Sequence, residues 1–181
     1  AVVCDEFLSD GIESLIQCHG IGGLRTNTVL VGWPRDASKA ETFGSNIRLI
    51  TRMNRSVLAA RFLAHRSADP EESDDASEHW NVPNGTIDVW WRGMKNGELM
   101  LLLAHLLHRN HQWRANPIRV LRVVDNAQDI GEVYQHLIDL GAASRIEFQP
   151  EVICDARSPE KIIQSVSSNA ALVILGFQTP D

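Results

Sequence analysis

The sequence predicts an α/β fold, in which helices alternate with the strands of a doubly wound, mainly parallel sheet. Segments with apolar residues at helical spacing alternate with short apolar runs rich in β-branched residues. These runs are apolar on both faces, as strands buried inside a parallel sheet are. Single helices between such strands imply right-handed crossovers, which place helices on the faces of the sheet. The chain of 181 residues, 44% of them hydrophobic, is long enough to bury a core.

Residues 1–66 form the first predicted part. Asp10 begins a capping-box pattern at the start of a short helix, and Gly20 ends that helix. The β-branched run Thr28–Trp33 predicts a buried parallel strand. Apolar residues at helical spacing across 41–63 predict one long helix. This part resembles the closing portion of an α/β unit, and the chain opens without Met, so we expect a fragment of a longer protein.

Residues 67–85 are acidic, contain two prolines and offer little to bury, which predicts a flexible loop. The second part, residues 86–181, alternates strands and helices. Its predicted strands are Ile87–Trp91, Ile118–Val124, Ile146–Phe148 and Leu172–Gly176. Its predicted helices are Glu98–Trp113, which is apolar nearly all round at its start and so deeply buried there, Asp129–Leu140, which Gly141 ends, and a helix begun by Ser158 and Pro159. The longer strands of this part and Thr28–Trp33 are expected at the centre of the sheet.

Composition and charge exclude several classes of protein. The net charge of −6 argues against a broad electrostatic grip on nucleic acid. Three widely spaced cysteines make no disulfide framework, which fits a reducing compartment. No apolar run approaches the roughly 18 residues of a membrane span, and the N-terminus has no signal-peptide pattern.

Several motifs that might suggest chemistry have simpler structural explanations. The glycine-rich run Gly20–Leu24 follows a helix and opens a strand, which is the reverse order of a dinucleotide-binding loop, so it predicts a tight turn. The residues His105, His108 and His111 fan round a helix and match no metal-ligand pattern. The turns after the first and last central strands carry prolines rather than glycines, so a phosphate nest is not expected there. We therefore expect no catalytic residue, no metal site and no cofactor.

Five residues are candidates for an interface. Arg48, Arg52 and Arg55 form a stripe on the predicted long helix, which is either a solvated face or a contact surface for acidic protein or anionic lipid. The adjacent Trp90 and Trp91 point to opposite faces of their strand. Core packing is the default interpretation of both, and an anchoring role at an interface is the alternative, since exposed Trp and Arg are typical anchors.

Three stretches of the chain form a recognisable set. The run GIGGLRTNTVLVGWP spans Gly20–Pro34, GTIDVWW spans Gly85–Trp91, and HQWR spans His111–Arg114. Together they resemble the cytoplasmic C-terminal domain of the cation-chloride cotransporters, and the resemblance covers most of residues 10–125. Animal members resemble IVHDGG after the two tryptophans, where this chain has Arg92–Gly97, which suggests a bacterial or archaeal relative.

The resemblance implies an α/β fold similar to universal stress proteins, in a unit of two subdomains. This chain would hold the end of the first subdomain and nearly all of the second. It implies a regulatory domain that forms a homodimer on the cytoplasmic side of the cell membrane, next to the membrane domain of the same chain, and not the path of the sodium, potassium or chloride ions. The alternative is a nucleotide-binding protein of the universal-stress type, which uses a glycine-rich loop after its last strand; such a loop is missing after Leu172–Gly176.

Overall fold

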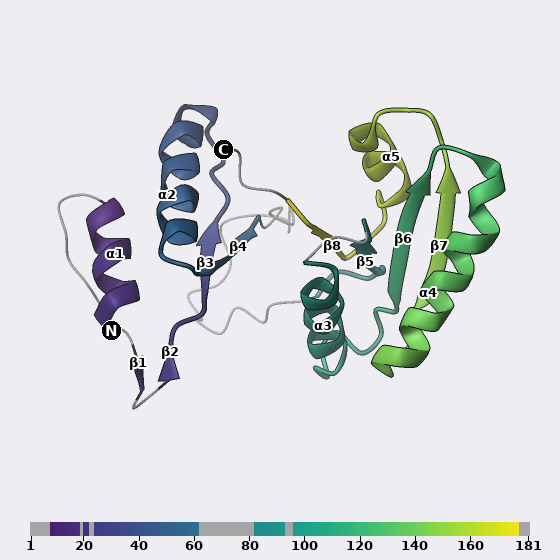
Figure 1. The fold of residues 1–181 in the computed structure, drawn as a ribbon, viewed down its shortest axis with the longest axis horizontal. Coiled ribbons are helices and arrows are strands. Elements are labelled where there is room, and N and C mark those ends of the chain that lie inside the picture. The colour runs from purple at the N-terminus through teal and green to yellow at the C-terminus, as the bar shows by residue number, and fades with distance from the viewer. Residues whose placement is uncertain (1–7, 19, 22–23, 62–81, 93–95, 178–181) are drawn as a thin grey trace, which may run out of the picture. The chain divides into compact units, whose positions relative to one another are not determined.

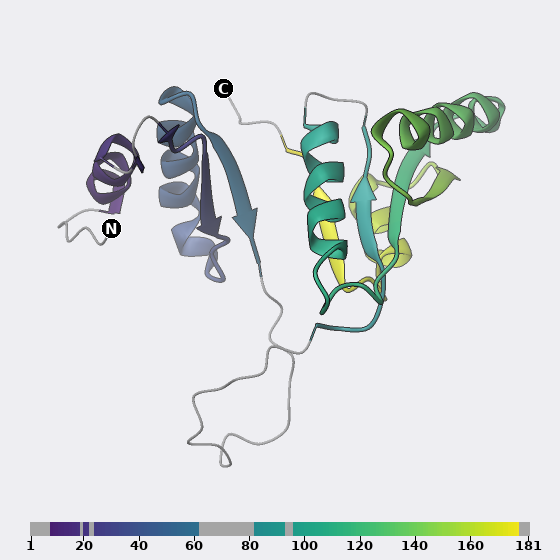
Figure 2. The same ribbon diagram turned by 90° about the horizontal axis from the view of Figure 1, so that it is seen from below.

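The computed structural model describes residues 8–18, 20–21, 24–61, 82–92 and 96–177 (Figures 1 and 2). The chain divides into two compact units, one formed by residues 1–73 with 179–181 and the other by residues 74–178. Most of the predicted acidic loop, residues 67–85, lies outside the described residues.

The first unit begins with helix α1 (Leu8–Cys18), on which Ile16 is buried. The predicted helix start is wrong, because α1 begins before Asp10, which lies in its first turn and not at its cap. Two short antiparallel strands follow, β1 (Gly20–Ile21) and β2 (Leu24–Arg25). They flank the two central glycines of this segment, which lie outside the described residues.

A strand–helix–strand element forms the rest of the first unit (Figure 1). Strand β3 (Thr28–Gly32) pairs in parallel with β4 (Ser56–Ala60). The 3₁₀ turn η1 (Ala37–Lys39) and helix α2 (Ala40–Arg52) connect the two strands. The prediction that Thr28–Trp33 is a buried strand at the centre of a sheet is wrong. Among the described strands β3 pairs with β4 alone, and Leu30 is 69% exposed.

The predicted helix over 41–63 is also wrong, because the chain leaves the helix at Asn54 and becomes a strand. Asn54 has a φ of 56°, in the left-handed region. Its N–H donates to the carbonyl oxygen of Thr51 at 2.9 Å, and the N–H of Arg55 donates to that of Ile50 at 3.2 Å. These two bonds form a Schellman motif, in which Asn54 takes the position that Gly usually holds.

The second unit is a four-stranded parallel sheet between helices, which confirms the predicted α/β fold with parallel strands. Its strands, in the spatial order β7-β6-β5-β8, are β5 (Ile87–Trp90), β6 (Ile118–Val124), β7 (Gln149–Cys154) and β8 (Leu172–Leu175). Its helices are α3 (Gly97–His108), α4 (Ile130–Ser144), which follows the 3₁₀ turn η2 (Ala127–Asp129), and α5 (Pro159–Val166). The chain adds β6 and β7 on one side of β5 and then crosses over through α5 to place β8 on the other side.

The two faces of this sheet bury different clusters. Helices α3 and α4 cover one face, where apolar residues of β5 and β6 pack against Met100, Leu101 and Leu137. Helix α5 covers the opposite face, where Ile162 packs against Trp90 and Leu121 (Figure 1). In the described part of the chain no helix is both long and apolar enough to cross a membrane.

Two helix ends in the second unit differ from the prediction. Helix α3 ends at His108, so Trp113 lies in the turns that follow it. Helix α4 continues through Gly141, which was expected to end it, and stops where Arg145 adopts a φ of 56°. Gly141 is used for packing instead, because a Cβ there would lie 3.3 Å from the ring of Phe148.

One strand was misplaced by the prediction. Residues Ile146–Phe148 are not a strand, and β7 runs immediately after them from Gln149. Pro150 lies inside β7 and cannot donate a backbone hydrogen bond. It is tolerated because β7 is an edge strand of the described sheet, which leaves one side without a partner strand.

A buried ion pair joins the two central strands. Asp88 on β5 is fully buried and stands opposite Arg119 on β6. The Nη2 and Nε atoms of Arg119 donate to the two carboxylate oxygens of Asp88 at 2.6 and 2.9 Å, and this hydrogen bonding raises the pKa of Arg119. Thr86 Oγ1 and Ser167 Oγ also donate to the carboxylate, at 2.6 and 2.7 Å, and Arg119 Nη1 reaches Glu151 at 3.0 Å.

Replacing Asn54 tests the left-handed helix end. Asn54→Gly is expected to keep or raise the thermal unfolding midpoint, whereas Asn54→Val should lower the unfolding free energy by about 1–2 kcal/mol, because a β-branched residue resists a positive φ. Asn126→Val is the matched control, since Asn126 has extended backbone with a φ of −117°. Equal effects of the two valine variants in circular-dichroism melts would contradict the assignment.

Replacing Asp88 tests the buried ion pair. Asp88→Ala leaves Arg119 without its main partner and should lower the unfolding free energy by about 3–5 kcal/mol in urea titrations. The control is Asp155→Ala, because Asp155 pairs with Arg157 at 2.6 Å on the surface. We expect the control to leave the urea midpoint nearly unchanged, since exposed pairs contribute little.

Candidate functional site

The three candidate arginines do not share one helix face. Arg48 and Arg52 lie one turn apart on α2, and Arg48 Nη2 donates to Ser45 Oγ at 3.1 Å. The predicted three-residue stripe is wrong, because Arg55 follows the left-handed Asn54 and stands outside the helix. Arg55 is partly buried, and its Nε has no hydrogen-bond partner. Of the three arginines, Arg48 and Arg52 remain as a basic pair on α2.

The two candidate tryptophans point to opposite faces of the sheet, as predicted. Trp90 lies on the α5 face, where its Nε1 donates to Ser167 Oγ at 3.0 Å. Trp91 lies on the α3 and α4 face, and its buried Nε1 has no hydrogen-bond partner in the described structure. With exposed fractions of 6% and 7%, both belong to the core of the second unit, so neither is left uncovered there. Their role at an interface stays a prediction.

Helix α3 leaves an apolar surface that the sequence did not reveal. The helix was expected to be buried nearly all round at its start, but only one side of it is, the side that carries Met100, Leu101 and Ala104. On the other side Leu99, Leu102 and Leu106 are 36%, 47% and 55% exposed. Their i, i+3 and i+7 spacing places them on one stripe, which we call the α3 leucine face. Contiguous exposed apolar side chains of this kind mark interaction surfaces.

The strand beside α3 is also open in the described structure. Strand β8 pairs with β5 and has no partner on its other side among the described strands. Leu175, the last residue of this strand, is 49% exposed, and Phe177, which follows the strand, is 41% exposed. Helix α3 packs beside this strand, because a Cβ on Gly176 would lie 3.2 Å from the sulfur of Met100. An open edge strand is the usual template for pairing with another chain.

The histidines on and after α3 do not converge. His108 Nδ1 donates to the carbonyl oxygen of Asn116 at 3.0 Å, and His111 lies beyond the helix in an exposed turn. Within the described ranges no three His, Cys, Asp or Glu side chains gather closely enough to hold a metal ion. The cysteines Cys18 and Cys154 are free and exposed.

The ends of the parallel strands carry locally paired carboxylates. After β3, Asp36 accepts the backbone N–H of Ser38 at 2.9 Å and begins η1; the same neighbour lowers the pKa of Asp36. After β7, Asp155 accepts from the guanidinium of Arg157, which lowers the pKa of Asp155. The turn that follows β8 is described only as far as Phe177.

The α3 leucine face can be tested by comparing neighbouring leucines. Leu101→Ala should lower the unfolding free energy by about 2–5 kcal/mol, because Leu101 is 2% exposed in the core. At concentrations low enough for the chain to be monomeric, Leu102→Ala should change it by no more than about 0.5 kcal/mol, as surface substitutions do. Urea titrations of the two variants at such concentrations measure both values. A loss at Leu102 equal to that at Leu101 would show that the face is covered within the unit itself.

The comparison with protein families adds the identity of the second unit. Residues 69–175 match the family model of solute carrier family 12, the cation-chloride cotransporters. The match covers more than half of the chain and includes all four strands of the second unit. Members of this family are membrane transporters and not enzymes. The resemblance deduced from the sequence is therefore confirmed, while the bacterial or archaeal source stays a prediction. The chain belongs to solute carrier family 12.

Proposed function

We propose that this chain is a cytoplasmic regulatory and dimerisation domain of an electroneutral cation-chloride cotransporter, and that it takes no part in the ion path. One observation carries the proposal. In the part that the structure describes, the segment that matches a family of membrane carriers folds as a parallel sheet between helices, with no helix long and apolar enough to cross a membrane.

The route of ions through a carrier has structural requirements that this unit does not meet. A segment that spans the bilayer must satisfy its backbone hydrogen bonds internally, as long apolar helices do. Ion sites in secondary transporters lie near the bilayer midplane, where such helices are interrupted. The second unit instead pairs its central charges, Asp88 and Arg119, inside a parallel sheet. We therefore propose that it lies outside the bilayer, beside the membrane domain of the same chain.

Two surfaces support self-association. The α3 leucine face offers an apolar centre of the type that stable interfaces bury. The basic pair Arg48 and Arg52 cannot meet its own copy across a two-fold axis without acidic partners, because like charges repel. The net charge of −6 shows that acidic residues outnumber basic ones, so such partners are abundant on the second copy.

Sedimentation equilibrium tests the dimer. We expect the chain to be a dimer at tens of micromolar, and we expect Leu102→Asp and Arg52→Glu each to weaken it about tenfold or more, as loss of one interface anchor does. Arg35→Glu is the matched control, because Arg35 is an exposed arginine of the same unit as Arg52 but lies outside α2. A monomer at every concentration would overturn the proposed dimer.

The same variants placed in the whole carrier test the regulatory role. If the domain lies outside the ion path, these variants should change the transport rate and leave the chloride concentration for half-maximal flux the same. A changed ion selectivity in Arg52→Glu or Leu102→Asp would contradict the proposal, because selectivity depends on the groups that line the path.

A further inference from the structure

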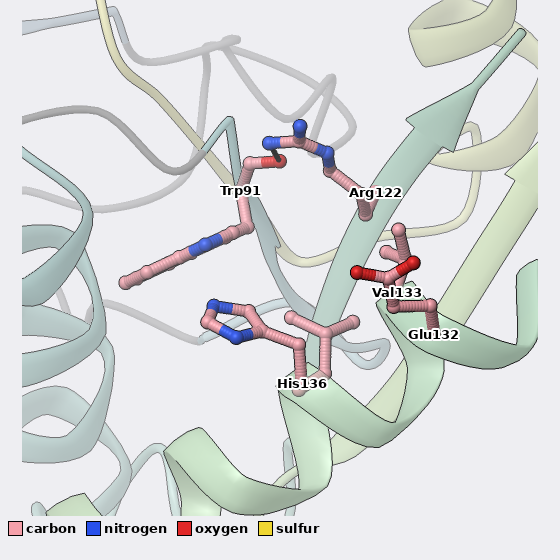
Figure 3. A pocket seen from close by; sticks show the side chains of 6 residues that line it. Trp91, Arg122, Glu132, Val133 and His136 are labelled. Atoms are coloured by element: carbon pink, nitrogen blue, oxygen red, sulfur yellow. Dashed lines mark hydrogen bonds between the residues drawn. The ribbon is translucent and has the colours of Figure 1, made fainter. Parts of the chain in front are cut away.

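The contact between α3 and the sheet sets which side of this helix faces outward. The indole of Trp91, just after β5, lies against Gly97, where a Cβ would come within 2.6 Å of the ring. Figure 3 shows this indole beside a hollow of about 190 Å³, whose other walls come from β6 and α4. Leu106 follows Gly97 by about two and a half helical turns, so it points to the opposite side. The α3 leucine face therefore points away from the sheet.

One charge lies at each end of the α3 leucine face. Glu98 is in the first turn of α3, and Arg109 is the C-cap residue, whose φ of −70° and ψ of −19° continue the helical turn. They are separated by about three turns of 3.6 residues, so they lie on nearly the same line along the helix. This line runs beside the leucines, because Leu102 follows Glu98 by about one turn and Leu106 precedes Arg109 by about one turn.

Both charges are available to a partner. Glu98 and Arg109 are exposed, and the ion pairs found within the described residues include neither of them. They cannot pair with each other, because three turns of helix separate them by about 16 Å. The outer side of α3 thus offers an apolar stripe with an acidic group beside its start and a basic group beside its end.

A two-fold axis through the middle of α3 brings opposite charges together. An antiparallel copy of the helix reverses the order of the residues along the axis and keeps each charge on the same flank of the contact. The midpoint between Glu98 and Arg109 lies between Leu102 and Leu106, in the leucine face itself. With the axis at this midpoint, Glu98 of each copy lies opposite Arg109 of the other, while the leucines of the two helices pack together between them.

We propose that the α3 helices of two copies pack antiparallel, leucine face against leucine face, with ion pairs between Glu98 of each copy and Arg109 of the other. A parallel pair would instead set each charge against its own copy, and like charges repel. An anionic lipid surface would accept the leucines and Arg109 but would repel Glu98. A second copy matches the apolar face and both charges at once. This inference rests on the proposed dimerisation and says where the two copies meet.

Charge reversal tests the pairing, because a two-fold axis makes every contact occur twice. In Glu98→Arg both contacts set arginine against arginine, and in Arg109→Glu both set glutamate against glutamate. We expect each variant alone to weaken the dimer about tenfold or more in sedimentation equilibrium. In an equimolar mixture of the two variants the heterodimer regains both ion pairs. Its affinity should therefore return to within about threefold of that of the unchanged chain.

Glu160→Arg is the matched control for charge reversal. Glu160 is an exposed acidic residue in the first turn of α5, as Glu98 is in the first turn of α3. Both substitutions lose the same favourable interaction with a helix dipole, but we expect Glu160→Arg to leave the dimer unchanged. Circular-dichroism melts check that all three variants fold. The loss in Glu98→Arg and Arg109→Glu should shrink in 1 M salt, where the Debye length is about 3 Å.

Cross-linking locates the axis. Leu102 lies close to the proposed axis, so a thiol there should come near the same thiol of the second copy. In a chain whose native cysteines are replaced by serine, Leu102→Cys should give a covalent dimer with a short bismaleimide. Lys161→Cys is the control, because Lys161 is exposed on α5, which covers the opposite face of the sheet. It should give no covalent dimer under the same conditions.

The possible results separate this inference from the proposed dimerisation. Three results would overturn the α3 pairing and leave the dimer itself in place: a dimer that neither charge variant weakens, a mixture that associates no more tightly than either variant alone, or no cross-link in Leu102→Cys. A lipid surface as the occupant of the leucine face would give the second of these results. A chain that stays monomeric at every concentration would overturn both proposals.

Discussion

The ion pair between Asp88 and Arg119 is the constraint on which the second unit depends. Four donor groups fill the carboxylate of Asp88: two nitrogens of Arg119 and the hydroxyls of Thr86 and Ser167. A carboxylate has about four lone-pair sites, so this buried charge is fully satisfied. Ser167 in turn accepts from the indole of Trp90. The network therefore ties β5 to β6 and to the end of α5.

The same pair specifies the register of the sheet. Asp88 stands opposite Arg119, and both side chains lie on the α5 face with Trp90 and Leu121. A shift of β5 by one residue would turn Asp88 to the face that α3 and α4 cover, which contains apolar side chains. An unpaired carboxylate there would cost several kcal/mol, on the order of 3–5. In the run IDVWW, Asp88 is thus the one charged residue among side chains that are all buried in a core.

The sequence alone was sufficient to locate helices and strands where their local patterns agreed with the tertiary packing. It located β5, β6, β8 and α5, because β-branched runs and a Ser-Pro helix start point the same way as the fold. It failed between α2 and β4, where Val57 and Leu58 continue the helical spacing of α2 by coincidence. The deciding signal was Asn54, one of the few residues that enters the left-handed region readily.

Two further failures have a common cause, which is that a residue's role depends on what lies next to it in space. Gly141 was expected to stop α4, but its missing Cβ makes room for Phe148. Leu102 was expected to be buried because α3 is apolar all round, and such a helix gives no polar side by which to orient it. The hollow beside Trp91 joins residues of three segments, so no single motif in the sequence could indicate it. These features require the packed structure. Between the two functions that the sequence left open, the family match favours a domain of a membrane carrier over a free-standing nucleotide-binding protein. The leucines that α3 exposes are the apolar surface that the proposed dimer would bury, because exposed apolar side chains of this kind mark interaction surfaces.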